Sequence, residues 1–191
     1  MSPFPQPNNR ILSQGGGITD AAFHEHFMRL ALREAGKAAQ CGEVPTGCVI
    51  IEPPEAPGAS PLSAKIIARG HNQAETLRDA TAHAEMIALT QAAAHRRDWR
   101  LNGTILYVTK EPCAMCAGAM VLARVSTLVF GLPDPKRGGV SLFNITAHPN
   151  LNHRVEVVGG VLLDECRQQF QGFFHACRGV ERPGKPGGEA G

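Results

Sequence analysis

The chain lacks a strong excess of charge of either sign. Its 191 residues carry 19 basic and 17 acidic side chains, for a formal net charge of +2 at pH 7. This balance excludes nucleic-acid binding through bulk positive charge, because that mode requires a basic surplus. Any contact with nucleic acid therefore has to come from a local patch of residues.

Long apolar runs are also missing. Nowhere does the chain reach the roughly 18 consecutive apolar residues of a membrane-spanning helix. Residues 1–17 are rich in Pro, Asn and Gly and lack the apolar run of a signal peptide. We therefore expect a cytoplasmic protein with no membrane contact, in which the cysteine thiols stay reduced. Four of these cysteines are expected to be small buried hydrophobic residues: Cys41, Cys48, Cys166 and Cys177.

The length of the chain fits one domain. Both ends are poor in large apolar residues, which predicts a flexible extension at 1–18 and a flexible tail at 180–191. A single domain is then expected at 19–179. No internal repeat is visible.

Helical and strand patterns alternate along this domain. Apolar residues at helical spacing predict helices at 20–41, 81–97, 113–123 and 164–178. Short apolar runs predict strands at 44–51, 65–68, 104–109, 127–131 and 155–158. The Pro-rich segment 52–64 predicts a long loop that joins the first two strands as a hairpin. Together these elements predict an α/β fold, a three-layer α/β/α sandwich with a mixed five-stranded sheet.

Two short motifs carry the candidate chemistry: His83-Ala84-Glu85 and Pro112-Cys113-Ala114-Met115-Cys116. Histidine and cysteine are zinc ligands, and the three ligands His83, Cys113 and Cys116 leave a fourth position for water, which is typical of catalytic zinc. Glu85 is then a carboxylate beside the metal without being a ligand, and is suited to proton transfer. The pattern predicts one zinc ion per subunit and hydrolytic deamination of an amidine-like ring carbon, with loss of ammonia.

Both motifs stand at predicted helix beginnings. A helix amino terminus carries partial positive charge, which favours the thiolate forms of Cys113 and Cys116 that zinc requires. Pro112 costs no hydrogen bond at such a position. The two helix beginnings are expected to converge on the metal.

A Cys-x-x-Cys motif alone is also found in structural zinc sites and in redox dithiols. A structural-zinc or redox protein is therefore the non-enzymatic alternative, although a redox dithiol has no use for Pro112 or the His-x-Glu motif. A zinc protease of the His-Glu-x-x-His type is excluded, because Ile87 stands where the second histidine is required.

The two motifs form the established signature of the zinc-dependent nucleobase deaminases, which the chain resembles. Within them it is similar to the bacterial tRNA-specific adenosine deaminase family. Further matching segments are Glu43 to Gly47, Gly70-His71-Asn72, Asp134-Pro135-Lys136, Asn152-His153-Arg154 and Phe173-Phe174. The resemblance runs over residues 20–178 and implies a cytidine deaminase-like fold.

The resemblance implies conversion of adenosine to inosine at the wobble position of tRNA, with arginine tRNA as the substrate. A guanine deaminase, or another free-base or nucleoside deaminase, shares the metal motif and is the enzymatic alternative. The resemblance also implies a homodimer in which each active site borrows surface from the other subunit.

Site residues follow from the same resemblance. Besides catalytic Glu85 and the three metal ligands, Asn72 would hydrogen-bond the adenine, and its pocket would be walled by Val44, Pro45 and Ala84. Contacts with the tRNA anticodon loop are implied for Asp134, Lys136, Asn152, Phe174 and Arg178. The chain departs from the family pattern at Lys110, where an aliphatic residue is usual, and in a turn at 137–140 that is one residue shorter.

Overall fold

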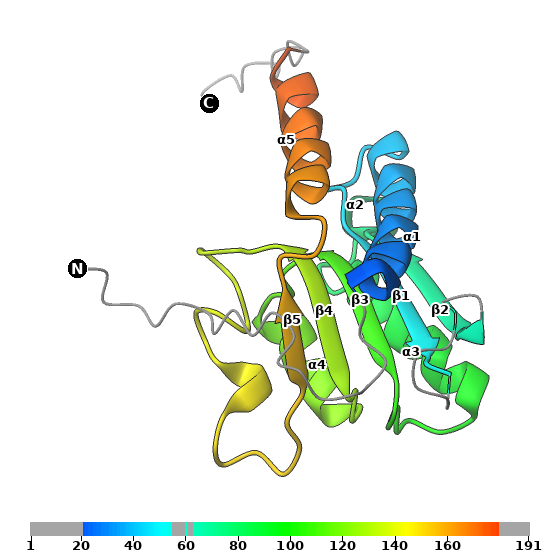
Figure 1. Ribbon diagram of the computed structural model, residues 1–191. Coiled ribbons are helices and arrows are strands. Elements are labelled where there is room, and N and C mark those ends of the chain that lie inside the picture. The colour runs from blue at the N-terminus through cyan, green and yellow to red at the C-terminus, as the bar shows by residue number, and fades with distance from the viewer. Residues whose placement is uncertain (1–20, 55–59, 61–62, 180–191) are drawn as a thin grey trace.

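The computed structural model describes residues 21–54, 60 and 63–179, and a mixed five-stranded sheet lies at its centre (Figure 1). The strands are β1 (Gly47–Glu52), β2 (Lys65–His71), β3 (Ile105–Lys110), β4 (Thr127–Leu132) and β5 (Glu156–Gly159). Their order in the sheet is β2-β1-β3-β4-β5. Strand β1 pairs antiparallel with β2 and β3, whereas β3, β4 and β5 run parallel. The predicted mixed sheet is confirmed.

Helices cover both faces of this sheet (Figure 1). Helix α1 (Ala21–Gln40) and the start of α5 (Leu163–Gly179) share a core with Val49, Ile51 and Tyr107. On the other face, α3 (Ala84–Arg96) and α4 (Ala114–Leu122) pack against Cys48, Ile50 and Leu106. Successive residues of a strand point to opposite faces, so β1 and β3 supply both cores. This is the predicted three-layer sandwich.

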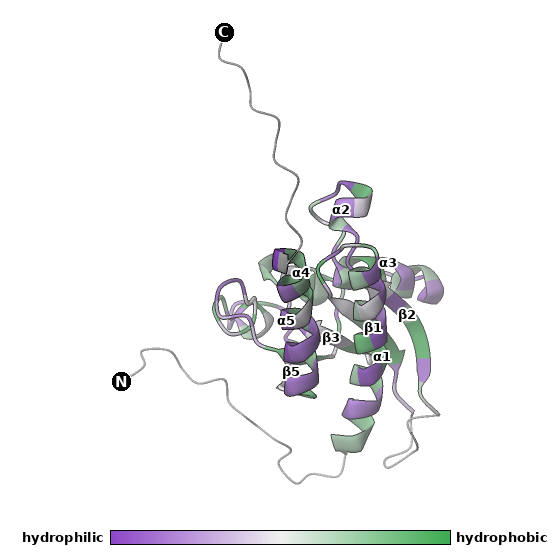
Figure 2. Cartoon of the chain, turned by 90° about the horizontal axis from the view of Figure 1, so that it is seen from above, coloured by the Kyte–Doolittle hydropathy of each residue, from purple (hydrophilic) through white to green (hydrophobic). Residues whose placement is uncertain are grey.

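The local sequence explains where α1 forms and ends. Phe23, Phe27 and Ala31 recur at helical spacing and are buried, and the Phe27 ring lies 5.3 Å from that of Tyr107 in β3. Gly42 adopts a φ of 76°, which halts the helix at the predicted position. Figure 2 shows hydrophilic residues along α1 and α5, as expected of helices with one face in solvent.

Strand β1 begins three residues later than predicted, at Gly47. The preceding segment makes a tight turn, in which the Thr46 N–H donates to the Val44 carbonyl at 2.7 Å. Gly47 then passes very close to α1, because a Cβ there would lie 2.1 Å from the Ala31 carbonyl oxygen. Strand β2 continues past its predicted end to His71, opposite Gly47. The extension places Asn72 beside Thr46, whose carbonyl accepts the Asn72 N–H at 3.0 Å.

Two short elements were not predicted, helix α2 (Ala74–Leu77) and the 3-10 helix η2 (Ile145–Ala147). Both are too short to show a periodic apolar pattern. The predicted flexible ends, 1–18 and 180–191, lie outside the described residues, as does most of the tip of the Pro-rich loop. Among the described helices, none is long and apolar enough to cross a membrane.

The cysteines are free thiols. Cys48 and Cys166 are buried, as predicted for small hydrophobic residues. For Cys41 and Cys177 the prediction is wrong, because both are exposed near the ends of α1 and α5.

Candidate active site and metal centre

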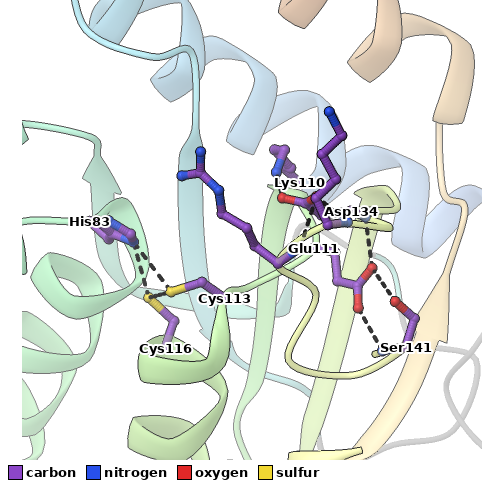
Figure 3. A network of polar contacts seen from close by, with 9 residues as sticks. His83, Lys110, Glu111, Cys113, Cys116, Asp134 and Ser141 are labelled. Atoms are coloured by element: carbon purple, nitrogen blue, oxygen red, sulfur yellow. Dashed lines mark hydrogen bonds and ion pairs between the residues drawn. The ribbon is translucent and has the colours of Figure 1, made fainter. Parts of the chain in front are cut away.

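The predicted metal ligands meet where α3 and α4 begin (Figure 3). His83 is the N-cap of α3 and Cys113 is the N-cap of α4, both with extended backbone. The carbonyl of each accepts the first hydrogen bond of its helix, from the N–H of Ile87 at 3.1 Å and of Ala117 at 2.9 Å. Cys116 lies in the first turn of α4 and is fully buried. Both amino termini therefore face one cluster of donor atoms, as predicted.

The spacing of these donor atoms fits a tetrahedral zinc site. The two Sγ atoms are 3.7 Å apart, and His83 Nδ1 lies 3.6 Å from Cys113 Sγ and 3.5 Å from Cys116 Sγ. Zinc bonds of about 2.3 Å to sulfur and about 2.0 Å to nitrogen place tetrahedral ligands about 3.8 Å (S to S) and about 3.5 Å (S to N) apart. The chain thus holds one histidine nitrogen and two thiols at the separations that zinc requires. Among the described residues, His83, Cys113 and Cys116 form the group of His, Cys or acidic side chains whose donor atoms lie close enough together to hold a metal ion.

The electrostatics of the cluster suit a cation. The hydrogen bond with Cys116 lowers the pKa of the Cys113 thiol to about 3, and His83 adds to the effect. The same bond, together with burial, raises the pKa of Cys116. His83 has a raised pKa, chiefly through its hydrogen bond with Cys113. Because a metal ion binds the deprotonated ligands, metal binding is expected to release protons from this cluster.

Glu85 lies one residue inside α3, next to the ligand cluster, and is only 3% exposed. Burial raises the pKa of its carboxyl group, against the lowering effects of its own backbone N–H and of His83. Within the described residues, its Oε2 atom has no hydrogen-bond partner. A buried carboxylate oxygen with a raised pKa and a free lone pair can take up and release a proton beside the metal.

Asn72 directly follows β2 and is held by a buried carboxylate. Its Nδ2 atom donates to Glu43 Oε2 at 3.0 Å. Glu43 also accepts the backbone N–H groups of Thr76 at 2.7 Å and Glu75 at 3.3 Å, at the start of α2. Burial alone raises the pKa of Glu43, but these hydrogen bonds outweigh it and the pKa is lowered. A charged Glu43 therefore fixes the orientation of the Asn72 amide.

The residues predicted to wall the base pocket differ in their exposure. Val44 is exposed, whereas Pro45 is buried and precedes Thr46, whose carbonyl accepts the Asn72 N–H. Ala84 is fully buried in the core between α3 and the sheet, with its carbonyl close to Gly70. A role for these three residues in base binding stays a prediction.

The loop after β4 packs directly on the metal cluster. Gly138 forms an isolated β-bridge with Cys113, and the Gly139 N–H donates to the Pro112 carbonyl at 2.8 Å. A Cβ at Gly139 would lie 2.6 Å from Ala117 Cβ, so only glycine allows this approach. Buried Glu111 binds the two sides of the loop, because it accepts the Asp134 N–H at 2.8 Å and the Ser141 N–H at 2.7 Å (Figure 3).

The residues predicted to contact RNA fall into three places. Asp134 and Lys136 share the loop after β4, and the Asp134 carboxylate accepts the Lys136 N–H at 3.0 Å. On α5, Phe174 and Arg178 line a surface groove together with Phe170, Gln171 and His175. Asn152 is exposed on a separate segment, where Arg124 binds its carbonyl at 3.1 Å. Their contacts with RNA remain predictions.

The sequence did not reveal the roles of Glu43 and Glu111. Each is almost fully buried and accepts several hydrogen bonds, and so organises a segment next to the site. The sequence offered only their position as a signal. Glu111 directly precedes a proline, Glu43 precedes Val44-Pro45, and each lies at one end of a buried strand. That position marks a charged residue next to the core but does not identify its partners.

Comparison with known proteins agrees with this geometry. Residues 21–132 match the family described as the cytidine and deoxycytidylate deaminase zinc-binding region. The tRNA-specific adenosine deaminase of Bacillus subtilis is 46% identical over 156 residues, which cover 81% of this chain and 90% of the relative.

Solved structures show the same fold. One, from biochemical and structural studies of A-to-I editing by tRNA:A34 deaminases at the wobble position of transfer RNA, superposes with a TM-score of 0.67. It is 38% identical, and the match covers 75% of this chain and 98% of that one. A guanine deaminase from Nitrosomonas europaea shares the fold at a TM-score of 0.64, over 91% of this chain and 96% of its own, but is 20% identical.

The family match includes all three donor residues and Glu85, and it identifies the metal as zinc. Within the zinc deaminases, the high sequence identity with tRNA adenosine deaminases, over most of both chains, identifies the subgroup. The chain therefore belongs to the zinc-binding cytidine and deoxycytidylate deaminase family and, within it, to the tRNA-specific adenosine deaminases.

Proposed function

We propose that the protein deaminates adenosine to inosine at the wobble position of tRNA. The observation that carries the proposal is the tetrahedral spacing of His83, Cys113 and Cys116 beside a buried carboxylate that is not a ligand. Membership of the tRNA-specific adenosine deaminases supports the substrate class. Water is consumed at the ring carbon that bears the amino group, the carbon to nitrogen bond breaks, and ammonia leaves.

In this mechanism His83, Cys113 and Cys116 hold zinc, which when bound acts as a Lewis acid that makes water a better nucleophile. Glu85 moves the protons. Its Oε2 atom accepts a proton from water and returns it to the substrate, so that the amino group leaves as neutral ammonia. Burial raises the pKa of Glu85, which strengthens its affinity for the proton that it takes up and passes on.

Recognition of the base is proposed to involve Asn72. Its side chain is held by Glu43, so the amide enters the complex already oriented. Glu43 binds the amide NH₂ group of Asn72, which leaves the amide oxygen as the group available to the base. The Val44 and Pro45 segment and Ala84 are proposed to complete the pocket.

The anticodon loop is proposed to lie across the loop after β4 and the carboxyl-terminal half of α5. Lys136 and Arg178 are exposed cations, and Phe174 is a half-buried aromatic residue on α5. Phosphates and unstacked bases are the groups that such side chains bind. Asn152 is proposed to add a polar contact. We also propose that the enzyme acts in the cytoplasm, where tRNA is found.

A homodimer is part of this proposal. Helix α4 has the sequence AMCAGAMVL, without a charged residue, and Leu122 at its end is 76% exposed. A helix that is apolar on all sides is normally covered. A second copy of the chain packed against the exposed side of α4 would cover this helix. It would also lie next to the metal centre, because α4 carries Cys116.

The decisive test uses the zinc-loaded protein with two substrates, an anticodon stem-loop of arginine tRNA with adenosine at the wobble position, and free guanine. We expect inosine at the wobble position and no turnover of guanine. A stem-loop with guanosine at that position serves as the blank. Turnover of guanine with an untouched adenosine stem-loop would falsify the proposed substrate.

A further inference from the structure

Lys110 is the last residue of β3, just before the segment that carries Cys113. Its ammonium group forms an ion pair and hydrogen bond with Asp134 Oδ2 (Figure 3). Both side chains are largely covered, at 21% and 13% exposed. Since Asp134 follows β4, the pair joins the ends of two neighbouring parallel strands.

The other oxygen of Asp134 binds the loop itself. Oδ1 accepts the backbone N–H of Lys136 at 3.0 Å and that of Arg137 at 3.2 Å. The Asp134 carbonyl accepts the Gly138 N–H at 2.9 Å. Burial raises the pKa of Asp134, but the hydrogen bond from Lys110 and those from the loop outweigh it and the pKa is lowered. Both carboxylate oxygens are thus already engaged within the chain, and the turn 134–138 is built around them.

Lys110 also faces α5. Its Nζ atom lies 5.4 Å from the centre of the Phe170 ring, within the range of a cation–π contact. Phe170 is in turn packed against Phe174, with ring centroids 5.0 Å apart. One ammonium group therefore contacts both the loop after β4 and the aromatic side of α5.

On the basis of the proposed function, we propose that Lys110 is a positioning residue for RNA recognition. Its contacts with Asp134 and Phe170 fix the turn 134–138 and the groove of α5 in one relative placement before the substrate arrives. A surface that is already ordered loses less conformational entropy on binding, so this placement lowers the cost of binding RNA. Lys110 acts through Asp134 and does not itself contact a phosphate.

The first measurement is independent of the substrate. Hydrogen exchange of the zinc-loaded protein without RNA should show faster exchange of the Lys136 and Arg137 N–H groups in Lys110→Met, because their acceptor is released. Lys65→Met is the matched control, because it removes a lysine that is 62% exposed and weakly paired with Glu52 at the far edge of the sheet. Equal exchange of these two amides in wild type and Lys110→Met would overturn the proposal. Lys110→Gln replaces Lys110→Met if the latter fails to fold.

The second measurement is kinetic. For the adenosine stem-loop we expect Lys110→Met to raise KM about tenfold, in the middle of the range for coupled neighbouring residues, with kcat changed less than about twofold. Lys110→Arg should restore most of the loss, since it keeps the charge. In an Asp134→Asn background, the same lysine substitution should change KM by less than about twofold.

Two kinetic results and one metal analysis would overturn the assignment. An equal rise of KM in both backgrounds means that Lys110 contacts RNA directly. A fall in kcat at constant KM, or a loss of zinc from Lys110→Met, means that it supports the metal centre instead. If wild type leaves the stem-loop untouched, the proposed function fails, and the exchange experiment still decides whether Lys110 orders the turn.

Discussion

Glu85 combines burial, a raised pKa and an unpaired oxygen at one position next to the metal ligands. Because Glu85→Gln keeps the size of the side chain and removes its ability to exchange a proton, we expect bound zinc to stay at the wild-type level. Deamination should fall by at least about 10²-fold, the usual contribution of a positioned acid–base group. Metal analysis and single-turnover deamination of the stem-loop measure the two quantities.

Cys113→Ala is the comparison for Glu85→Gln. Loss of one of the three ligands should lower both zinc content and activity, whereas Glu85→Gln should lower activity alone. Near-normal turnover in Glu85→Gln would show that another group moves the proton. Full zinc occupancy in Cys113→Ala would contradict the ligand assignment.

Glu43 makes stability depend on pH in a defined direction. Its pKa is below the ordinary value of 4.5, so the folded state favours the carboxylate. The stabilisation is therefore complete above pH ~4.5 and is lost as the pH falls through the lower folded pKa. Glu43→Gln should lower the melting temperature at pH 7, and the difference from wild type should shrink below pH ~4.5.

Thermal melts of both proteins at a series of pH values, in the presence of a chelator, test this prediction. The chelator removes the separate effect of zinc loss at low pH. A difference in melting temperature that stays constant from pH 7 to the acid limit would show that the charge of Glu43 contributes nothing.

At the scale of single elements, the loop after β4 requires glycine at position 139. In Gly139→Ala the new Cβ would lie 2.6 Å from Ala117 Cβ and 2.8 Å from the Cys113 carbonyl oxygen. The loop and the start of α4 must then separate, which we expect to destabilise the protein by about 1–3 kcal/mol. Because α4 begins at Cys113, zinc affinity should fall as well.

Gly172→Ala provides the control for this loop variant. Gly172 lies inside α5 with no atom near its added Cβ, so alanine should stabilise the helix by about 0.5–1 kcal/mol. Denaturant unfolding and zinc titration of the two variants give the comparison. If Gly139→Ala has wild-type stability and zinc affinity, the loop does not support the metal centre.

The elements themselves were largely predictable, because apolar periodicity reports local structure. The strands and long helices lie close to their predicted positions, and the spacing of His83 to Cys116 was sufficient to predict the metal cluster. Residue pairs such as Glu43 with Asn72, or Lys110 with Asp134, were not predicted. The two residues of each pair are far apart in the chain and meet only after the sheet has brought the strand ends together. The sequence around one residue carries no information about which distant residue it will contact.

At the scale of the whole molecule, the proposed dimer rests on the uncharged helix α4. Introducing a charge at its exposed end, in Leu122→Glu, should convert the dimer to a monomer of about 20.4 kDa, because a buried unpaired carboxylate costs several kcal/mol. Sedimentation velocity at several concentrations measures the change. Deamination should fall with it, since each active site is proposed to use surface from the other subunit.

Leu77→Glu is the matched control, because Leu77 is also exposed, at 57%, but lies on α2. It should leave the sedimentation coefficient at the wild-type value. A monomeric wild type would refute the dimer directly. If the Leu122→Glu protein stays dimeric, the dimer interface does not include the end of α4. The second subunit is then not expected to reach the metal centre.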